Sequence, residues 1–166
     1  MQTFLTLLGA TAAFIITRLF FAETAAVFAP TLAITFFAAV WARQTLNALA
    51  VPLVAYLIGD LVLGTGIAQL VVYASLLAFA LLGRFVATQS LTTQYASVFA
   101  GITLFDLTTN LACWAGPFYP HTAEGLAASF TAALPFYIAK LNGLAAIGVA
   151  HYGLTHLRRQ STAFAH

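Results

Sequence analysis

The chain has 166 residues, of which 62% are hydrophobic and 6% are charged. A soluble domain is about 45–50% apolar and about 25% charged, so this composition excludes a soluble globular domain and a disordered chain. Six lysines and arginines against four acidic residues, with no basic run, also exclude a nucleic-acid-binding domain. We therefore expect an integral membrane protein.

Apolar segments of nearly membrane-spanning length recur along the whole chain. A spanning helix needs about 20 apolar residues, so 166 residues allow about six spans with short connections and leave no room for a soluble domain. We predict an all-α membrane protein in which residues 1–166 form one domain, a bundle of six transmembrane helices. The expected spans are residues 4–21, 27–42, 46–63, 67–86, 95–116 and 135–156.

The connections between these spans are short. Gly64-Thr65-Gly66 is expected to form the turn after the third span, and residues 89–94 a polar connection after the fourth. The longest connection, residues 117–134, contains a stretch of helical composition at residues 121–133. This composition predicts a short surface helix between spans five and six. The N-terminus lacks the positively charged region of a signal peptide, so the first segment is expected to be retained.

The few charged residues predict an orientation. If the N-terminus is cytoplasmic, four of the six cations fall inside and three of the four anions fall outside, as the positive-inside rule requires. The inner cations are Arg43, Arg84, Arg158 and Arg159, and the outer anions are Glu23, Asp60 and Glu124. Both termini are therefore expected to be cytoplasmic.

Two ionisable residues lie inside the expected spans. Asp106 is near the middle of the fifth span, and Lys140 is about one turn into the sixth from the outer side. Intramembrane charges are costly, so such residues are functional candidates by default. Either they form an ion pair that only joins two helices, or one or both contact a polar ligand.

The fifth span carries a polar stripe. Asp106, Asn110 and Trp114 recur every four residues and share one helix face, with Cys113 on the adjacent flank. This face either makes interhelical hydrogen bonds or forms the wall of a cavity that opens outward. The following residues are aromatic and turn-rich, which is typical of a small-molecule pocket and also of an interfacial aromatic belt. The candidate substrate-binding residues are Asp60, Asp106, Asn110, Cys113, Trp114, Tyr119, His121 and Lys140.

Metal and catalytic chemistry have little support in the sequence. Cys113 is the single cysteine, which excludes an intrachain disulfide and a cysteine-rich metal cluster. Cys113 and His121 could each contact a soft metal or cobalt, although a cysteine in an apolar span is more often a packing residue. No nucleophile–base set or phosphate loop is present, so we expect neither an enzyme nor a resident cofactor or metal.

Several motifs together resemble the substrate-binding S components of energy-coupling factor vitamin transporters, and more specifically an uncharacterised bacterial family of small transport-type proteins related to them. The resemblance covers about residues 18–150. The motifs are Phe28-Ala29-Pro30, Val51-Pro52-Leu53-Val54, Asp60-Leu61-Val62-Leu63-Gly64, Leu82-Gly83-Arg84, the run Thr109–Trp114, and the run Tyr119–Leu126 followed by Ala133–Tyr137. Asp106 departs from that pattern, because an apolar residue is usual there, and so do Val27, Ile138 and Ala139.

The resemblance implies a membrane-embedded uptake protein of the bacterial cytoplasmic membrane. Its ligand would be a vitamin or another micronutrient bound between the outer loops and spans four to six. Cobalamin is one candidate, because Cys113 and His121 could approach cobalt. An energy-coupling module of two ATPases and a coupling subunit would drive uptake, and that subunit would contact Gly9 and Ala13 on the first span. Alternatively, the protein works without such a module.

A different class of function remains open. The polar groups of the spans are also compatible with a structural or accessory subunit of a membrane complex, which has no ligand of its own. An intramembrane enzyme is the weaker third alternative, because no catalytic set can be assembled from the sequence.

Overall fold

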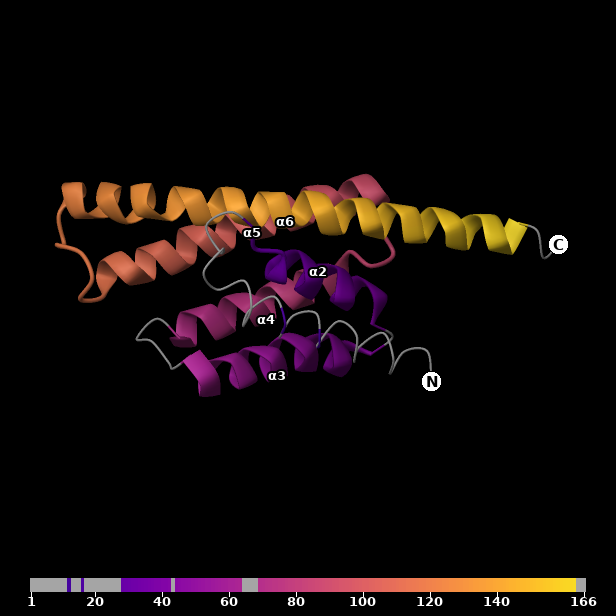
Figure 1. Ribbon diagram of the computed structural model, residues 1–166, viewed down its shortest axis with the longest axis horizontal. Coiled ribbons are helices and arrows are strands. Elements are labelled where there is room, and N and C mark those ends of the chain that lie inside the picture. Colours follow the sequence, from indigo (N-terminus) through magenta and orange to yellow (C-terminus); the bar gives the residue numbers. More distant parts are fainter. Residues whose placement is uncertain (1–11, 13–15, 17–27, 43, 64–68, 164–166) are drawn as a thin grey trace.

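All elements of the computed structural model are helices across the residues that it describes, namely 28–42, 44–63 and 69–163 together with Ala12 and Ile16 (Figure 1). This confirms the all-helical fold class for that part of the chain. The first expected span lies outside it apart from Ala12 and Ile16, and so does the expected Gly64-Thr65-Gly66 turn. The helices are α2 (Thr31–Trp41), α3 (Thr45–Leu63), α4 (Gln69–Phe85), α5 (Leu91–Ala115) and α6 (Ala123–Ala163).

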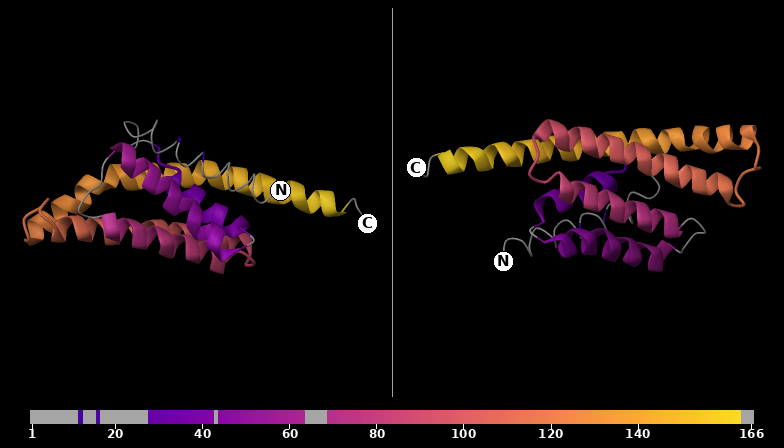
Figure 2. Two further views of the ribbon diagram at one scale, coloured as in Figure 1. Left: turned by 90° about the horizontal axis from the view of Figure 1, so that it is seen from below. Right: turned by 180° about the vertical axis from the view of Figure 1, so that it is seen from behind.

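The helices form two antiparallel pairs around a short central helix. Figure 1 shows α5 beside α6 and α3 beside α4, with α2 between the pairs, and all these neighbours are in contact. The start of α6 lies at one end of the bundle, which we call the Glu124 end. The end of α4 lies at the opposite end, which we call the Arg84 end. The last turns of α6 extend beyond the other described helices at the Arg84 end (Figures 1 and 2).

The central helix α2 supplies much of the core. It has only 11 residues, yet Leu32, Phe36 and Phe37 are at most 3% exposed. Phe36 packs edge-on against Phe37 and at a tilt against Phe79 of α4. A helix that is apolar on every side needs neighbours on every side, and α2 has them in α3, α4, α5 and α6.

Two of the described helices are long and apolar enough to cross a membrane. They are α5, with 25 residues, and the first 35 residues of α6, Ala123–Leu157. The expectation of six full spans is therefore not supported. At about 1.5 Å per residue, α2 is about 16 Å long, whereas a bilayer core is about 30 Å thick. The second expected span is shortened because Pro30 occupies the N-cap position of α2.

The prediction of a separate surface helix before the sixth span is wrong. A single helix, α6, runs for 41 residues and contains Pro135. Proline removes one backbone donor and often ends a helix, but here both sides of Pro135 pack on α5. Ser129 donates to the Asn110 carbonyl before it, and Tyr137 is hydrogen-bonded to Thr103 after it. These contacts hold the helix continuous through the proline.

The connection into α5 is shorter than expected. Ser90 caps the helix by accepting a hydrogen bond from the Thr93 amide, 3.2 Å away. Serine is a favoured N-cap residue because its side chain satisfies an amide that has no partner within the helix. Consequently α5 begins at Leu91 rather than at residue 95.

Two glycines on α6 provide a matched test of this packing. A Cβ on Gly143 would lie 2.5 Å from the Pro30 Cα, where the chain enters α2, while a Cβ on Gly153 would meet nothing within 4 Å. We expect Gly143→Ala to lower the melting temperature, because backbone must move. Gly153→Ala should leave the melting temperature unchanged or raise it, because alanine favours the helix over glycine by up to about 1 kcal/mol. Melting curves of the detergent-purified protein measure both, and equal effects of the two changes would contradict this packing.

Candidate functional site: a cavity between α5 and α6

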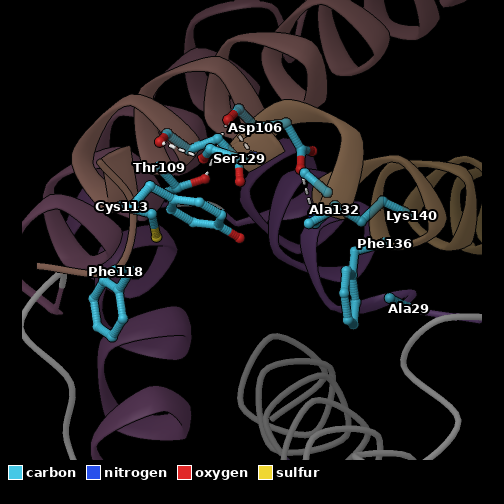
Figure 3. A pocket seen from close by; sticks show the side chains of 12 residues that line it. Ala29, Asp106, Thr109, Cys113, Phe118, Ser129, Ala132, Phe136 and Lys140 are labelled. Carbon is cyan, nitrogen blue, oxygen red and sulfur yellow. Dashed lines mark hydrogen bonds and ion pairs between the residues drawn. The ribbon is translucent and has the colours of Figure 1, made fainter. Parts of the chain in front are cut away.

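A cavity of about 480 Å³ lies between α5 and α6 on the side of the Glu124 end. Its volume is within the range of about 300–1,000 Å³ typical of small-molecule sites. Figure 3 shows Phe118 at one side of the cavity and Phe136 at the other, with Asp106 and Ser129 between them. The lining residues are Ala29, Asp106, Thr109, Asn110, Cys113, Phe118, Tyr119, Ser129, Ala132, Ala133, Phe136 and Lys140.

An ion pair forms the floor of this cavity. The Lys140 Nζ donates to Asp106 Oδ1 at 2.6 Å, and the two side chains are only 16% and 11% exposed. The ammonium also lies 5.7 Å from the centre of the Phe105 ring, in a cation–π position. Of the two expectations for these residues, the structure confirms that they are paired.

The second oxygen of the Asp106 carboxylate is in an unusual position. Asp106 Oδ2 is buried, and no described residue hydrogen-bonds to it. A buried acceptor without a partner costs about 1–3 kcal/mol, and more when it is charged. Asp106 is also a lining residue of the cavity. The floor therefore contains an unsatisfied anionic acceptor next to a cation.

The polar wall above the floor comes from both helices. The Thr109 hydroxyl donates to the Phe105 carbonyl at 2.8 Å, and the Ser129 hydroxyl donates to the Asn110 carbonyl at 3.1 Å. The Asn110 amide donates to the Asp106 carbonyl at 2.8 Å. Each hydroxyl has one hydrogen and two lone pairs. These hydroxyls therefore present lone pairs to the cavity while their hydrogens face the backbone.

The turn between α5 and α6 is built by two residues that the sequence suggested for ligand binding. The Trp114 indole N–H is shared between the carbonyls of Pro120 and Thr122, at 3.1 and 3.2 Å. A ring nitrogen of His121 lies 3.1 Å from the Gly116 carbonyl. Neither residue is among the lining residues of this cavity, and their polar atoms are used to fold the turn.

Asp60 also lies apart from the cavity. It accepts hydrogen bonds from the side chains of Gln69 and Tyr73 and is 4% exposed. These contacts join the end of α3 to the start of α4. Asp60 therefore joins two helices and is not among the lining residues of the cavity, so its expected part in substrate binding stays a prediction.

A family model described as "Family of unknown function (DUF6580)" matches residues 1–165 of the chain. The chain belongs to this family. No curated protein and no solved structure matches it significantly.

Five of the eight expected binding residues line the cavity. They are Asp106, Asn110, Cys113, Tyr119 and Lys140. The rest of the α6 wall was missed, although Ser129, Ala132, Ala133 and Phe136 share one helix face with Lys140. These residues lie on both sides of Pro135, so their spacing indicates a common face only if the helix continues through the proline. The expected partner-binding residues, Gly9 and Ala13, lie outside the described residues.

The part of the chain that the structure describes contains no group of three or more His, Cys, Asp or Glu side chains able to hold a metal ion. Cys113 lines the cavity, whereas His121 is held in the turn against the Gly116 carbonyl.

The buried charges make a testable prediction about stability. Asp106→Asn removes the counter-ion of Lys140 and should lower the melting temperature of the ligand-free protein. The expected loss in the free energy of unfolding is on the order of 3 kcal/mol. Lys140→Met should do the same by leaving the carboxylate unpaired. The double variant should recover much of the loss, because no uncompensated charge remains.

The measurement is a double-mutant cycle on melting curves of the detergent-purified protein. Strictly additive losses in the double variant would show that the two side chains do not interact, and would contradict the ion pair.

Proposed function

We propose that the protein is a membrane-embedded binding and uptake protein for a small, vitamin-like micronutrient. The observation that carries this proposal is the cavity between α5 and α6, whose floor is a buried ion pair with one carboxylate oxygen still unsatisfied. Intramembrane ionisable residues are rare and are concentrated on substrate pathways. The resemblance of the sequence to S components of vitamin transporters supports the same function.

The distribution of side chains supports insertion into a membrane. Large apolar side chains lie on the surface, with Leu61, Leu70 and Phe85 each at least 80% exposed. Two carboxylates are buried beside the apolar core, since Asp60 and Asp106 are at most 8% exposed. Large exposed apolar side chains together with buried carboxylates are unusual for a water-soluble protein and suit a hydrocarbon surrounding. We propose that the shorter helices and the first apolar segment complete a six-segment bundle in the bacterial cytoplasmic membrane.

The proposed orientation places both termini in the cytoplasm. Arg84 is in the last turn of α4 and Glu124 in the first turn of α6, and these helix ends lie at opposite ends of the bundle (Figure 1). The positive-inside rule then makes the Arg84 end cytoplasmic and the Glu124 end external. In this orientation the cavity lies toward the external face, where a nutrient would enter.

This orientation predicts the labelling of single cysteines introduced into a Cys113→Ala background. A cysteine in place of Glu124 should react with an impermeant thiol reagent on intact cells, because the start of α6 is external. A cysteine in place of Gln89 should react only after permeabilisation. The reverse pattern would contradict the orientation and the external opening of the cavity.

Energy for uptake has to come from a partner or from a gradient, and the resemblance favours the partner. An energy-coupling factor module would supply two ATPases and a coupling subunit, which would pack against Gly9 and Ala13 of the first segment. A small-xxx-small pair allows the close backbone approach that such a contact needs. We propose this pair as the coupling surface on the basis of the resemblance alone.

One observation favours an alternative. Lys140 and Asp106 already pair with each other, so the pair also fits an accessory subunit in which it only joins α5 to α6. The two functions differ in one outcome, since only the binding protein holds a small molecule in the cavity.

Native mass spectrometry of the full chain, purified in mild detergent, tests the proposed function. We expect a small molecule to be retained by the wild type and by Ala145→Trp, a control at an exposed position of α6 outside the cavity. Ala132→Trp should abolish retention, because the indole fills the cavity. No retained molecule in any sample, or equal retention by both tryptophan variants, would favour the accessory subunit.

A further inference from the structure

The charges that the described residues bring to the cavity are balanced before any ligand enters. Asp106 and Lys140 are the charged residues among the described lining side chains, and they form a pair at 2.6 Å. A ligand with a net charge would bring a third charge into an apolar site where the described residues offer no further counter-charge, and burial of an unpaired charge is costly. The cavity therefore favours a molecule without net charge.

The floor offers an acceptor and a donor side by side. Asp106 Oδ2 is buried without a partner. A partial rotation of the carboxylate about its broad terminal torsion turns this oxygen toward the cavity, which Asp106 lines. The Lys140 ammonium has three hydrogens, and Asp106 Oδ1 is the acceptor that the described residues provide. This arrangement complements a group that presents an N–H next to a C=O.

The wall adds further acceptors and an apolar surface. The hydroxyl hydrogens of Thr109 and Ser129 are already donated to backbone carbonyls, so their remaining capacity is to accept. Most of the other lining side chains are aromatic or small and apolar, with Phe118 and Phe136 on either side of the lined region in Figure 3. Flat rings gain most from such walls.

We infer that the cavity binds an uncharged aromatic molecule with an amide-like polar edge, whose N–H faces Asp106 and whose C=O faces Lys140. This inference rests on the proposed function and names the chemical class of its substrate. A cavity of about 480 Å³ suits one or two fused rings with a short substituent. A corrinoid macrocycle with its nucleotide tail is too large for this volume, so the inference replaces cobalamin by a much smaller heterocyclic or carboxamide ligand.

Four probes that share one skeleton separate charge from hydrogen bonding. They are cinnamamide, the cinnamate anion, the cinnamylamine cation and N,N-dimethylcinnamamide, which lacks the N–H. At millimolar concentration we expect cinnamamide to raise the melting temperature of the full chain more than the other three do. Equal or greater stabilisation by the anion or the cation would overturn the electroneutral site. Equal stabilisation by the dimethyl amide would overturn the role of the N–H donor, and no stabilisation by cinnamamide would overturn the inference as a whole.

Two neighbouring threonines provide a matched pair of variants. Thr108 and Thr109 both donate to the carbonyl four residues earlier, at 2.9 and 2.8 Å, but only Thr109 lines this cavity. Thr109→Val should weaken cinnamamide binding by about three- to tenfold, the effect of one lost hydrogen bond. Thr108→Val should leave binding unchanged. Equal effects of the two variants would overturn the assignment of this wall to the ligand.

Failure of this inference can be distinguished from failure of the proposed function. A retained natural molecule that is charged or lacks hydrogen-bond donors would overturn the inference alone, because retention itself supports the binding protein. Absence of any retained molecule, together with no response to the four probes, would overturn both.

Discussion

The ion pair between Asp106 and Lys140 sets the relation between the two longest helices. Two opposite charges in an apolar bundle are tolerated only when they face each other, because either one alone would be buried without a counter-charge. Their meeting fixes how far α6 slides along α5. Tyr95 with Gly148, Thr103 with Tyr137, and Asn110 with Ser129 then follow as hydrogen bonds along the same antiparallel contact.

The cavity is a consequence of this register. The ion pair lies at one end of the cavity between α5 and α6. Phe118 and Tyr119, from the α5–α6 turn, line the end nearer the turn. Between them, Ala132 and Ala133 leave room where larger side chains would fill the gap. The result is a balanced pair of charges at the base of a largely apolar, open cavity, which explains why a neutral, partly polar ligand fits this site better than an ion.

The sequence predicts some of this structure well and some of it poorly, for identifiable reasons. Apolar runs locate α3 and α4 closely, because hydropathy changes abruptly at their ends. Helix spacing puts Asp106 and Asn110 on one face of the helix. The spacing does not show which other element packs against that face. The sequence therefore could not show that Trp114, His121 and Asp60 make hydrogen bonds in the turn and on α4, because these partners appear only in three dimensions. The α6 wall was missed because Pro135 resembles a helix boundary unless tertiary contacts hold the helix together.

The single cysteine gives the most direct test of the central claim, that an accessible cavity lies between α5 and α6 above the ion pair. Cys113 lines the cavity and is half-buried. Methyl methanethiosulfonate, a small uncharged thiol reagent, should modify Cys113 in the folded, detergent-purified wild type and in Ala145→Trp, and much more slowly in Ala132→Trp. The account would be contradicted if Cys113 reacted only after denaturation, or at the same rate in all three proteins.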